Sequence, residues 1–245
     1  MERLTQEQLD AIGQFDGPTV CNALECFAIR PRSDGFSSPG IQPRTNSPGR
    51  LIGYAATAKV SARHPPDSGA GERLMEYYAQ VGETAKPTVA VIQDIDPQPI
   101  GSFWGEVQAT VHKALGAIGT VTHGGVRDTD EADSLGFQFF ATEVLISHAY
   151  IHVVEQGRGV EIKGLRICPG DLVFADKYGV VKIPPEIAPR LPEACRLVAE
   201  AELPLLEPCR EAIAKGTIPG LDDLKSWREA INQARNAVAA QLRSK

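Results

Sequence analysis

A stretch between residues 104 and 131 holds the side chains of this sequence that are best suited to chemistry. Arg127 and Asp128 are adjacent and directly follow a Gly-Gly-Val turn, and Glu131 comes three residues after Asp128. A guanidinium can hold a carboxylate through two parallel hydrogen bonds, and a carboxylate is a hard oxygen ligand suited to Mg²⁺ or Mn²⁺. The pair could therefore hold an anionic substrate and a divalent cation side by side.

The local sequence also allows simpler roles for these residues. An exposed Arg127–Asp128 ion pair would contribute little to stability, and such pairs are common. Asp128 and Glu131 would share one face of a helical turn, where like charges repel unless a cation lies between them. Glu106 lies at an expected helix start and could simply complement the helix dipole. The same helix start, residues 105–108, presents backbone amides that could bind an anion, so both interpretations stay open here.

The histidines and cysteines form no comparable pattern. His123 could act as a general acid or base, or it could be a packing residue at a strand end. His148 and His152 have HxxxH spacing but no other feature of a metal site. The five cysteines are odd in number and lack CxxC spacing, which predicts reduced thiols and no structural zinc site. The sequence also lacks a P-loop and a GxGxxG after a strand, which argues against the usual ATP, dinucleotide and S-adenosylmethionine sites.

The elements expected around this stretch are buried strands and the helix between them. A nearly continuous apolar run at 87–95 ends in acidic residues, as a buried strand does when its carboxyl end meets polar groups. A helix is expected at 105–115, and a second buried strand at 118–122 leads directly to His123. Alternation of strand and helix predicts an α/β fold.

The remaining segments are predicted from caps, periodicity and prolines. A capping box at Thr5 opens a helix to about residue 15, and Asp16-Gly17-Pro18 opens a second one. Short β segments after residue 135 are expected to form a β layer that closes over the α/β layer. Prolines should divide 185–215 into several helical segments, since each costs about 3 kcal/mol inside a helix. The other predictions are a loop at 30–48, a strand at 51–61, a helix at 72–81, β segments at 137–142, 160–162, 172–175 and 180–183, and an amphipathic helix at 221–243.

Composition limits the classes of partner. The chain has 245 residues, is 42% hydrophobic and carries a net charge of −6. Nucleic acids and anionic membrane surfaces attract positive potential, so neither is an expected partner. No signal-peptide pattern and no apolar run of about 18 residues is present, which leads us to expect a cytoplasmic protein. A small-molecule substrate fits this composition better.

Four motifs follow one another along the sequence. They are Phe-Trp-Gly-Glu at 103–106, Gly-Gly-Val-Arg-Asp at 124–128 with Glu131, Cys-Pro-Gly-Asp-Leu-Val-Phe-Ala-Asp at 168–176, and Gly-Val-Val-Lys-Ile-Pro at 179–184. In this order they resemble the RraA-like family, and the resemblance extends from about residue 19 to residue 184. The gap between Gly105 and Arg127 is also close to the family's. The enzymes of that family are class II 4-hydroxy-4-methyl-2-oxoglutarate/4-carboxy-4-hydroxy-2-oxoadipate aldolases that also decarboxylate oxaloacetate.

The resemblance implies a fold and an assembly. The fold would be an α-β-β-α sandwich of the swivelling β/β/α type with an extra C-terminal helix. We expect an aldolase domain over 1–216 and a helical extension over 217–245. The family's assembly, a homotrimer or a dimer of trimers, places the active site between subunits.

The resemblance also implies roles for individual residues. Asp128 would bind Mg²⁺ or Mn²⁺ directly, Glu106 and Glu131 would orient metal-bound waters, and Arg127 would bind the substrate's carboxylate and keto oxygen. The implied reaction is retro-aldol cleavage of a 4-hydroxy-2-oxo acid to pyruvate, or decarboxylation of oxaloacetate, through a metal-stabilised pyruvate enolate, with a metal-bound water or hydroxide as base. The amides expected to hold a substrate carboxylate are those of Gly105, Glu106, Val107 and Gln108.

The sequence departs from the family pattern at three places, one of which is the terminal helix with Trp227 that extends past the family core. Thr122-His123 replaces the family's common pair of an aliphatic residue and Asp or Asn before the glycines. Pro204 and Pro208 interrupt a late helix that in the family can lend a glutamate to a neighbouring subunit's metal shell. Among the glutamates there, at 200, 202 and 207, we single out Glu202.

Two other functions are compatible with the resemblance. RraA itself is a regulatory protein that binds a ribonuclease without catalysis. Glu131 favours the lyase, because non-catalytic members tend to lack this second acid. A lyase or hydratase acting on a different oxo or hydroxy acid would share the same site.

Overall fold

The computed structural model describes residues 3–46 and 49–244. The chain folds into two compact units, each formed from segments that are far apart in the sequence. Unit 1 comprises residues up to 5 together with 33–186, and unit 2 comprises 6–32 together with the residues from 187 onwards.

Unit 1 is built on one mixed sheet of eight strands. Its members are β1 (Gln42–Pro43), β2 (Arg50–Ser61), β3 (Thr88–Asp94), β4 (Ala117–Thr122), β6 (Gln138–Ala141), β8 (His152–Gln156), β11 (Leu172–Asp176) and β12 (Gly179–Ile183). The strand order is β1-β6-β4-β3-β2-β11-β12, and β8 also pairs with β2. Strands β2, β3, β4 and β6 run parallel to one another, and the remaining pairings are antiparallel.

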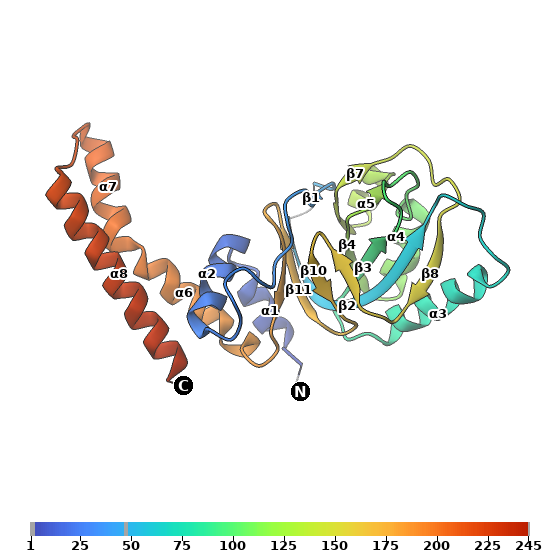
Figure 1. Ribbon diagram of the computed structural model, residues 1–245, viewed down its shortest axis with the longest axis horizontal. Coiled ribbons are helices and arrows are strands. Elements are labelled where there is room, and N and C mark those ends of the chain that lie inside the picture. Colours follow the sequence, from blue (N-terminus) through green and yellow to red (C-terminus); the bar gives the residue numbers. More distant parts are fainter. Residues whose placement is uncertain (1–2, 47–48, 245) are drawn as a thin grey trace. The chain divides into compact units, whose positions relative to one another are not determined.

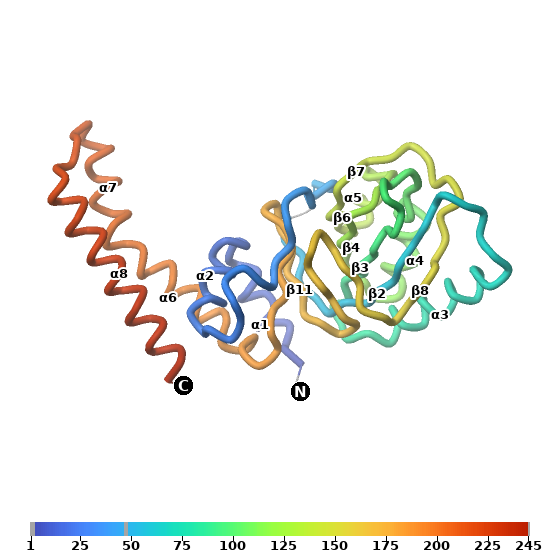
Figure 2. The backbone as a smooth tube through the Cα atoms, in the orientation of Figure 1, coloured from blue at the N-terminus to red at the C-terminus, as the bar shows by residue number. Residues whose placement is uncertain are grey.

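Strand β2 is long enough to have two different neighbours on one side. At its start Tyr54 lies opposite Leu172 of β11, and on its other side the same residue lies opposite Thr88 of β3. Near its end Val60 lies opposite Val153 of β8, after a shift of register at a bulge. A bulge of this kind increases the local twist of a strand, and Figure 2 shows the course of β2 through unit 1.

Both faces of the sheet are buried, which explains the continuous apolar run of β3. Val89 and Val91 pack in a cluster with the hairpin of β9 (Val160–Ile162) and β10 (Leu165–Ile167). Ala90 and Ile92 point to the other face and join a cluster that includes side chains of the helices. Those helices are α3 (Ala70–Glu83), α4 (Glu106–Ala114) and α5 (Thr129–Ser134), and they surround one side of the sheet (Figure 1).

The mixed α/β class is confirmed, and the strands and helices predicted between residues 51 and 122 are confirmed to within two residues. The expected separate β layer is wrong in its membership. β6, β11 and β12 belong to the main sheet, and the β9–β10 hairpin forms a small sheet of its own. The reason is the length of β2. β11 pairs with the first part of β2 and β8 with its last part, and this pairing makes both strands members of the main sheet. β8 and β10 were not predicted.

Unit 2 is helical. Its helices are α1 (Gln6–Ile12), α2 (Gly17–Phe27), the short 3₁₀ helix η1 (Ala188–Arg190), α6 (Leu191–Ala201), α7 (Leu203–Lys215) and α8 (Leu221–Arg243). The predicted helix start at Asp16-Gly17-Pro18 is confirmed, and Asp16 also caps α2, with its Oδ1 accepting the Thr19 N–H at 3.0 Å. The predicted break in the proline-rich segment is confirmed between α6 and α7, beside Pro204, but the interruption expected at Pro208 is wrong, because Pro208 lies inside α7. The helix α1 ends at Ile12, earlier than predicted.

Helices α7 and α8 lie side by side as a hairpin (Figure 1). The predicted bounds of α8 are confirmed, and Ile231, Val238 and Leu242 of its apolar stripe are buried. The predicted domain boundary after residue 216 stays a prediction. Across 3–46 and 49–244, no helix has both the length and the apolar character needed to cross a membrane.

Candidate functional site

Backbone pairing brings the start of α4 next to Arg127 and Asp128. Trp104 forms a bridge with Val126, and the Arg127 N–H donates to the Trp104 carbonyl at 3.0 Å. The hydroxyl of buried Ser102 lies 2.9 Å from the Gly125 carbonyl and also within hydrogen-bonding distance of the Trp104 carbonyl. These contacts hold residues 102–104 against residues 125–127, although α4 and β4 separate the two segments in the sequence.

The Asp128 carboxylate is the meeting point of this site. Its Oδ2 accepts the N–H of Glu106 at 3.0 Å and lies 3.7 Å from Nε of Arg127. The Asp128 backbone is left-handed, with φ 52°, a conformation that aspartate tolerates better than most residues. The arginine and aspartate side chains are 36% and 37% exposed, so a ligand can reach both.

Gly105 makes the approach of the carboxylate possible. A Cβ atom at this position would lie 2.5 Å from Oδ2 of Asp128 and 3.2 Å from Nε of Arg127. Both distances are shorter than ordinary van der Waals contacts. The Phe-Trp-Gly-Glu motif therefore requires its glycine for space beside the aspartate.

The amides at the start of α4 are only partly available to a ligand. The first helical hydrogen bond runs from Ala109 N–H to the Gly105 carbonyl, so earlier amides lie outside the helical ladder. The Glu106 N–H is already bound by Asp128. The amides of Val107 and Gln108 remain candidates for a substrate carboxylate. The Gln108 side chain accepts the Tyr78 hydroxyl at 2.9 Å, so we expect only its backbone to contribute.

The structure brings together fewer carboxylates than a site with three protein ligands would need. Within the part of the chain that the structure describes, no three His, Cys, Asp or Glu side chains gather closely enough to hold a metal. Glu106 and Glu131 have exposed side chains and do not join Asp128 in such a group. Mg²⁺ usually keeps several waters and binds through one or two carboxylates. Asp128 fits this sparser arrangement, because a carboxylate offers acceptor capacity beyond the two contacts at Oδ2.

Glu202 lies in unit 2, where its Oε1 accepts a hydrogen bond from Nη2 of Arg235 at 2.7 Å. This ion pair gives Glu202 a partner of its own. The role assigned to it in a neighbouring subunit's metal shell stays a prediction, as do the roles of the other site residues.

His123 is held by the backbone at the end of β4. Its Nε2 lies 2.9 Å from the carbonyl of Asp94, and its own carbonyl accepts the Thr142 hydroxyl at 2.6 Å. Burial, the largest effect, lowers the pKa of His123. These contacts favour the packing role over the general acid or base.

Asp94 is a residue of interest that the sequence patterns did not single out. It ends β3, is 3% exposed, and its Oδ1 accepts the Asp96 N–H at 2.9 Å. Burial raises the pKa of Asp94 to about 6. The available signal was its position, since an acid at the carboxyl end of a buried strand is a common place for a functional group.

The sequence matches the model of the RraA-like family, described as Aldolase/RraA, over residues 17–182. Protein DlpA of Legionella pneumophila is 33% identical over 175 residues, which cover 66% of this chain and only 27% of DlpA. A protein of Halalkalibacterium halodurans, named provisionally as a 4-hydroxy-4-methyl-2-oxoglutarate aldolase, is 26% identical over 189 residues, covering 74% of this chain and 80% of that protein.

Among solved structures, RraAS2 of Streptomyces coelicolor is similar, with a TM-score of 0.64 and 22% identity. The match covers 86% of this chain and 98% of that one. RraAS2 is described as an unusual member of the RNase ES inhibitor RraA protein family. At this identity the likeness concerns the fold alone.

Proposed function

Because the chain belongs to the RraA-like family, we propose that it is a divalent-metal-dependent carbon–carbon lyase acting on pyruvate-like substrates. Its substrates would be 4-hydroxy-2-oxo acids, cleaved to pyruvate, and oxaloacetate, which it would decarboxylate. The observation that carries the proposal is the convergence of the Glu106 amide, the Arg127 guanidinium and the Asp128 carboxylate beside Gly105. The family also contains proteins related to ribonuclease inhibitors, so membership alone does not decide between the two activities.

Arg127 supplies the positive charge that the reaction needs from the protein. A 2-oxo acid presents a carboxylate and a keto oxygen close together, and a planar guanidinium can hydrogen-bond both. When the carbon–carbon bond breaks, its electron pair moves toward the keto group, and negative charge grows on that oxygen. A fixed guanidinium stabilises this charge more in the transition state than in the substrate.

Asp128 positions the other components. Its carboxylate holds the start of α4 through the Glu106 N–H, which fixes the amides of Val107 and Gln108 for a second carboxylate of the substrate. Asp128 would hold Mg²⁺ or Mn²⁺, with Glu106 and Glu131 contacting its water ligands. A cation there would supply Lewis-acid stabilisation of the developing charge.

We also propose that the protein is a homo-oligomer, either a trimer or a dimer of trimers. Exposed apolar side chains near the site support this. Val107 is 73% exposed, Val144 is 58% exposed and Ile146 is 97% exposed. Val144 belongs to β7 (Glu143–Val144), which pairs with β5 (Gly125–Val126) directly before Arg127. An apolar surface there favours burial against a second copy.

Pyruvate release from oxaloacetate and from 4-hydroxy-4-methyl-2-oxoglutarate tests the function, with Mn²⁺ or Mg²⁺ and then with EDTA. Asp128→Asn keeps a residue that tolerates the left-handed backbone, and it should abolish Mn²⁺ binding and lower kcat/KM at least about 100-fold. Arg127→Gln should lower kcat/KM similarly while Mn²⁺ still binds. Asp222→Asn on the exposed start of α8 is the matched control and should change neither quantity.

Two outcomes would count against the lyase. One is metal-independent or undetectable pyruvate release from both substrates by the unmodified protein. The other is full activity in Asp128→Asn. Undetectable release together with binding of a ribonuclease would favour the regulatory function instead.

A further inference from the structure

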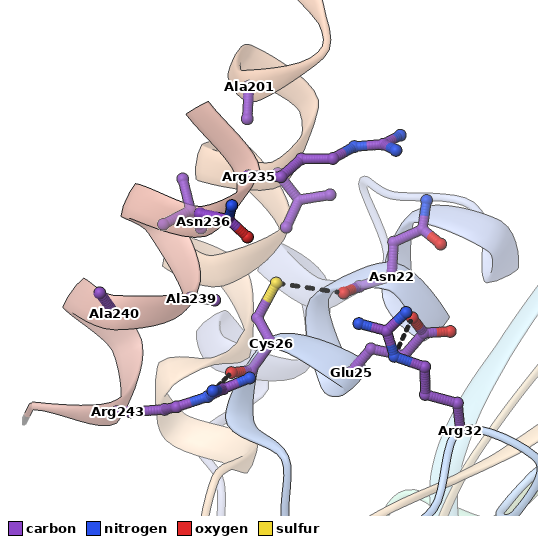
Figure 3. Close-up of a pocket in the computed structure, with 12 residues that line it drawn as sticks. Asn22, Glu25, Cys26, Arg32, Ala201, Arg235, Asn236, Ala239, Ala240 and Arg243 are labelled. Atoms are coloured by element: carbon purple, nitrogen blue, oxygen red, sulfur yellow. Dashed lines mark hydrogen bonds and ion pairs between the residues drawn. The ribbon is translucent and has the colours of Figure 1, made fainter. Parts of the chain in front are cut away.

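Unit 2 contains a surface cavity that is lined by none of the residues proposed for catalysis. It lies between α2, α6 and α8 and has a volume of about 300 Å³, which is within the range of small-molecule sites. Figure 3 shows the side chains around it. Its apolar wall is formed by small or medium residues, namely Val198, Ala201, Val238, Ala239 and Ala240.

The polar side of the cavity is dominated by arginines. Arg235 and Arg243 come from α8, and Arg32 comes from the segment after α2 (Figure 3). Glu25 is the only carboxylate among the described residues that line the cavity. Glu25 pairs with Arg32, and Glu202, just outside the lining, pairs with Arg235, so three guanidinium groups against two carboxylates still leave an excess of positive charge, although the whole chain carries a net charge of −6. This local reversal of charge is what an anionic ligand would require.

Each of these arginines has a contact that positions its guanidinium group and keeps further N–H donors for a ligand. Nε of Arg243 donates to the Cys26 carbonyl at 2.9 Å, and Nε of Arg32 lies 3.3 Å from Glu25 Oε2. Arg235 uses Nη2 to bind Glu202 outside the lining. Each contact engages one nitrogen of a group that has five N–H donors. Positioned guanidinium groups with spare donors lose little freedom when they bind a ligand.

The other polar residues indicate binding rather than chemistry. The Cys26 thiol lies 3.4 Å from the Asn22 carbonyl, and burial, the largest effect, raises its pKa. A nucleophilic cysteine needs the opposite shift. Asn22 and Asn236 add amide groups that can donate to oxygen atoms.

We propose that this cavity binds a small multivalent anion, either a polycarboxylate or a phosphorylated metabolite, separately from the site at Arg127 and Asp128. We infer two or more negative groups in the ligand because Arg32, Arg235 and Arg243 all line the cavity, at separate places around it (Figure 3). The small apolar wall would accept a short carbon skeleton between those groups. The proposal goes beyond the lyase function and does not depend on it.

Calorimetric titration with citrate and with pyrophosphate, at matched ionic strength, tests the proposal. The full chain carrying Arg127→Gln is the parent protein, so that binding at the proposed catalytic site does not interfere. We expect micromolar to low-millimolar binding of at least one probe, and the preferred probe distinguishes carboxylate from phosphate. Arg243→Gln and Arg32→Gln should each weaken that binding about tenfold or more, since each removes a charged hydrogen-bond donor.

Arg228→Gln is the matched control, because Arg228 lies exposed on α8 outside the cavity and its loss changes the net charge equally. The affinity of the Arg228→Gln variant for the preferred probe should stay within twofold of the parent protein's affinity. Arg32 is 79% exposed at its side chain, so Arg32→Gln tests the cavity even if Arg243→Gln impairs folding. No binding of either probe, or equal weakening by Arg228→Gln, would overturn the proposal.

Labelling of Cys26 gives a second measurement on the same protein. The rate at which maleimide modifies Cys26, measured by peptide mass spectrometry, should fall at least threefold when the probe is bound. Cys209 on α7 lies outside the cavity and should react at an unchanged rate. Equal rates at Cys26 with and without saturating probe would place the anion elsewhere.

Discussion

Replacing Gly105 by alanine should damage both stability and catalysis through one contact. The added Cβ would lie 2.5 Å from Oδ2 of Asp128, a separation that cannot persist. The backbone of Gly105 has φ −163° and ψ −171°, an extended conformation that alanine adopts without strain. The clash therefore falls on the short Asp128 side chain, which must rotate away from the Glu106 amide.

The expected loss of stability follows from the loss of the hydrogen bond between the Glu106 N–H and the Asp128 carboxylate. A carboxylate that caps a helix amide contributes about 1–2 kcal/mol, and alanine regains about 0.5 kcal/mol by restricting the unfolded chain. The net loss of about 1 kcal/mol should lower Tm by about 2–4 °C in a chain of this size. A displacement near 1 Å of a group that positions substrate can lower kcat/KM by about 100-fold.

Gly71→Ala is the matched control. Gly71 is the second residue of α3, and a Cβ there would meet nothing within 4 Å. Alanine should raise the free energy of unfolding there by about 0.5–1 kcal/mol, because glycine is a poor helix former. Thermal melts and pyruvate release would be measured on both variants. Gly105→Ala with unchanged Tm and turnover would show that the Asp128 carboxylate does not occupy the place beside Gly105.

Two buried groups should make stability depend on pH in opposite directions. Burial lowers the pKa of His112 to about 4, so below about pH 6.5 the unfolded chain takes up a proton that the folded chain does not. The free energy of unfolding should therefore fall by up to about 3 kcal/mol from pH 6.5 toward pH 4. Urea unfolding of His112→Gln should show a smaller fall over the same range. Burial raises the pKa of Asp94 to about 6. The contribution of the protonated Asp94 carboxyl to the free energy of unfolding is therefore fully present below about pH 4 and is lost as pH rises through 6. Asp94→Asn should therefore gain stability over the unmodified protein between pH 4 and pH 8, and a constant difference would contradict the raised pKa.

The sequence patterns were most informative where one local property decides the structure. The apolar runs of β3 and β4 are buried on both faces, and the Asp16 cap fixes the start of α2. Strand order could not be predicted, because the pairing of β2 with β11 and β8 depends on contacts between residues far apart in the chain.

The candidate site shows the same division. Residue types and spacing drew attention to Arg127 and Asp128, and the family resemblance supplied their proposed roles. The hydrogen bond from the Glu106 amide to Asp128 was not predictable, because it depends on the bridge between Trp104 and Val126. The i+3 spacing of Asp128 and Glu131 suggested a shared cation, but within the described residues their carboxylates do not gather in a group of three ligands.

The two-sided pairing of β2 has a consequence for synthesis of the chain. Residues 50–61 leave the ribosome long before β8 and β11, which complete the same edge. Until then β2 presents unpaired N–H and C=O groups on a strongly apolar strand, a surface that favours pairing with other chains. Closing such long loops also slows folding. The nascent protein therefore remains vulnerable to aggregation until residue 176 has emerged, whatever the stability of its finished sheet.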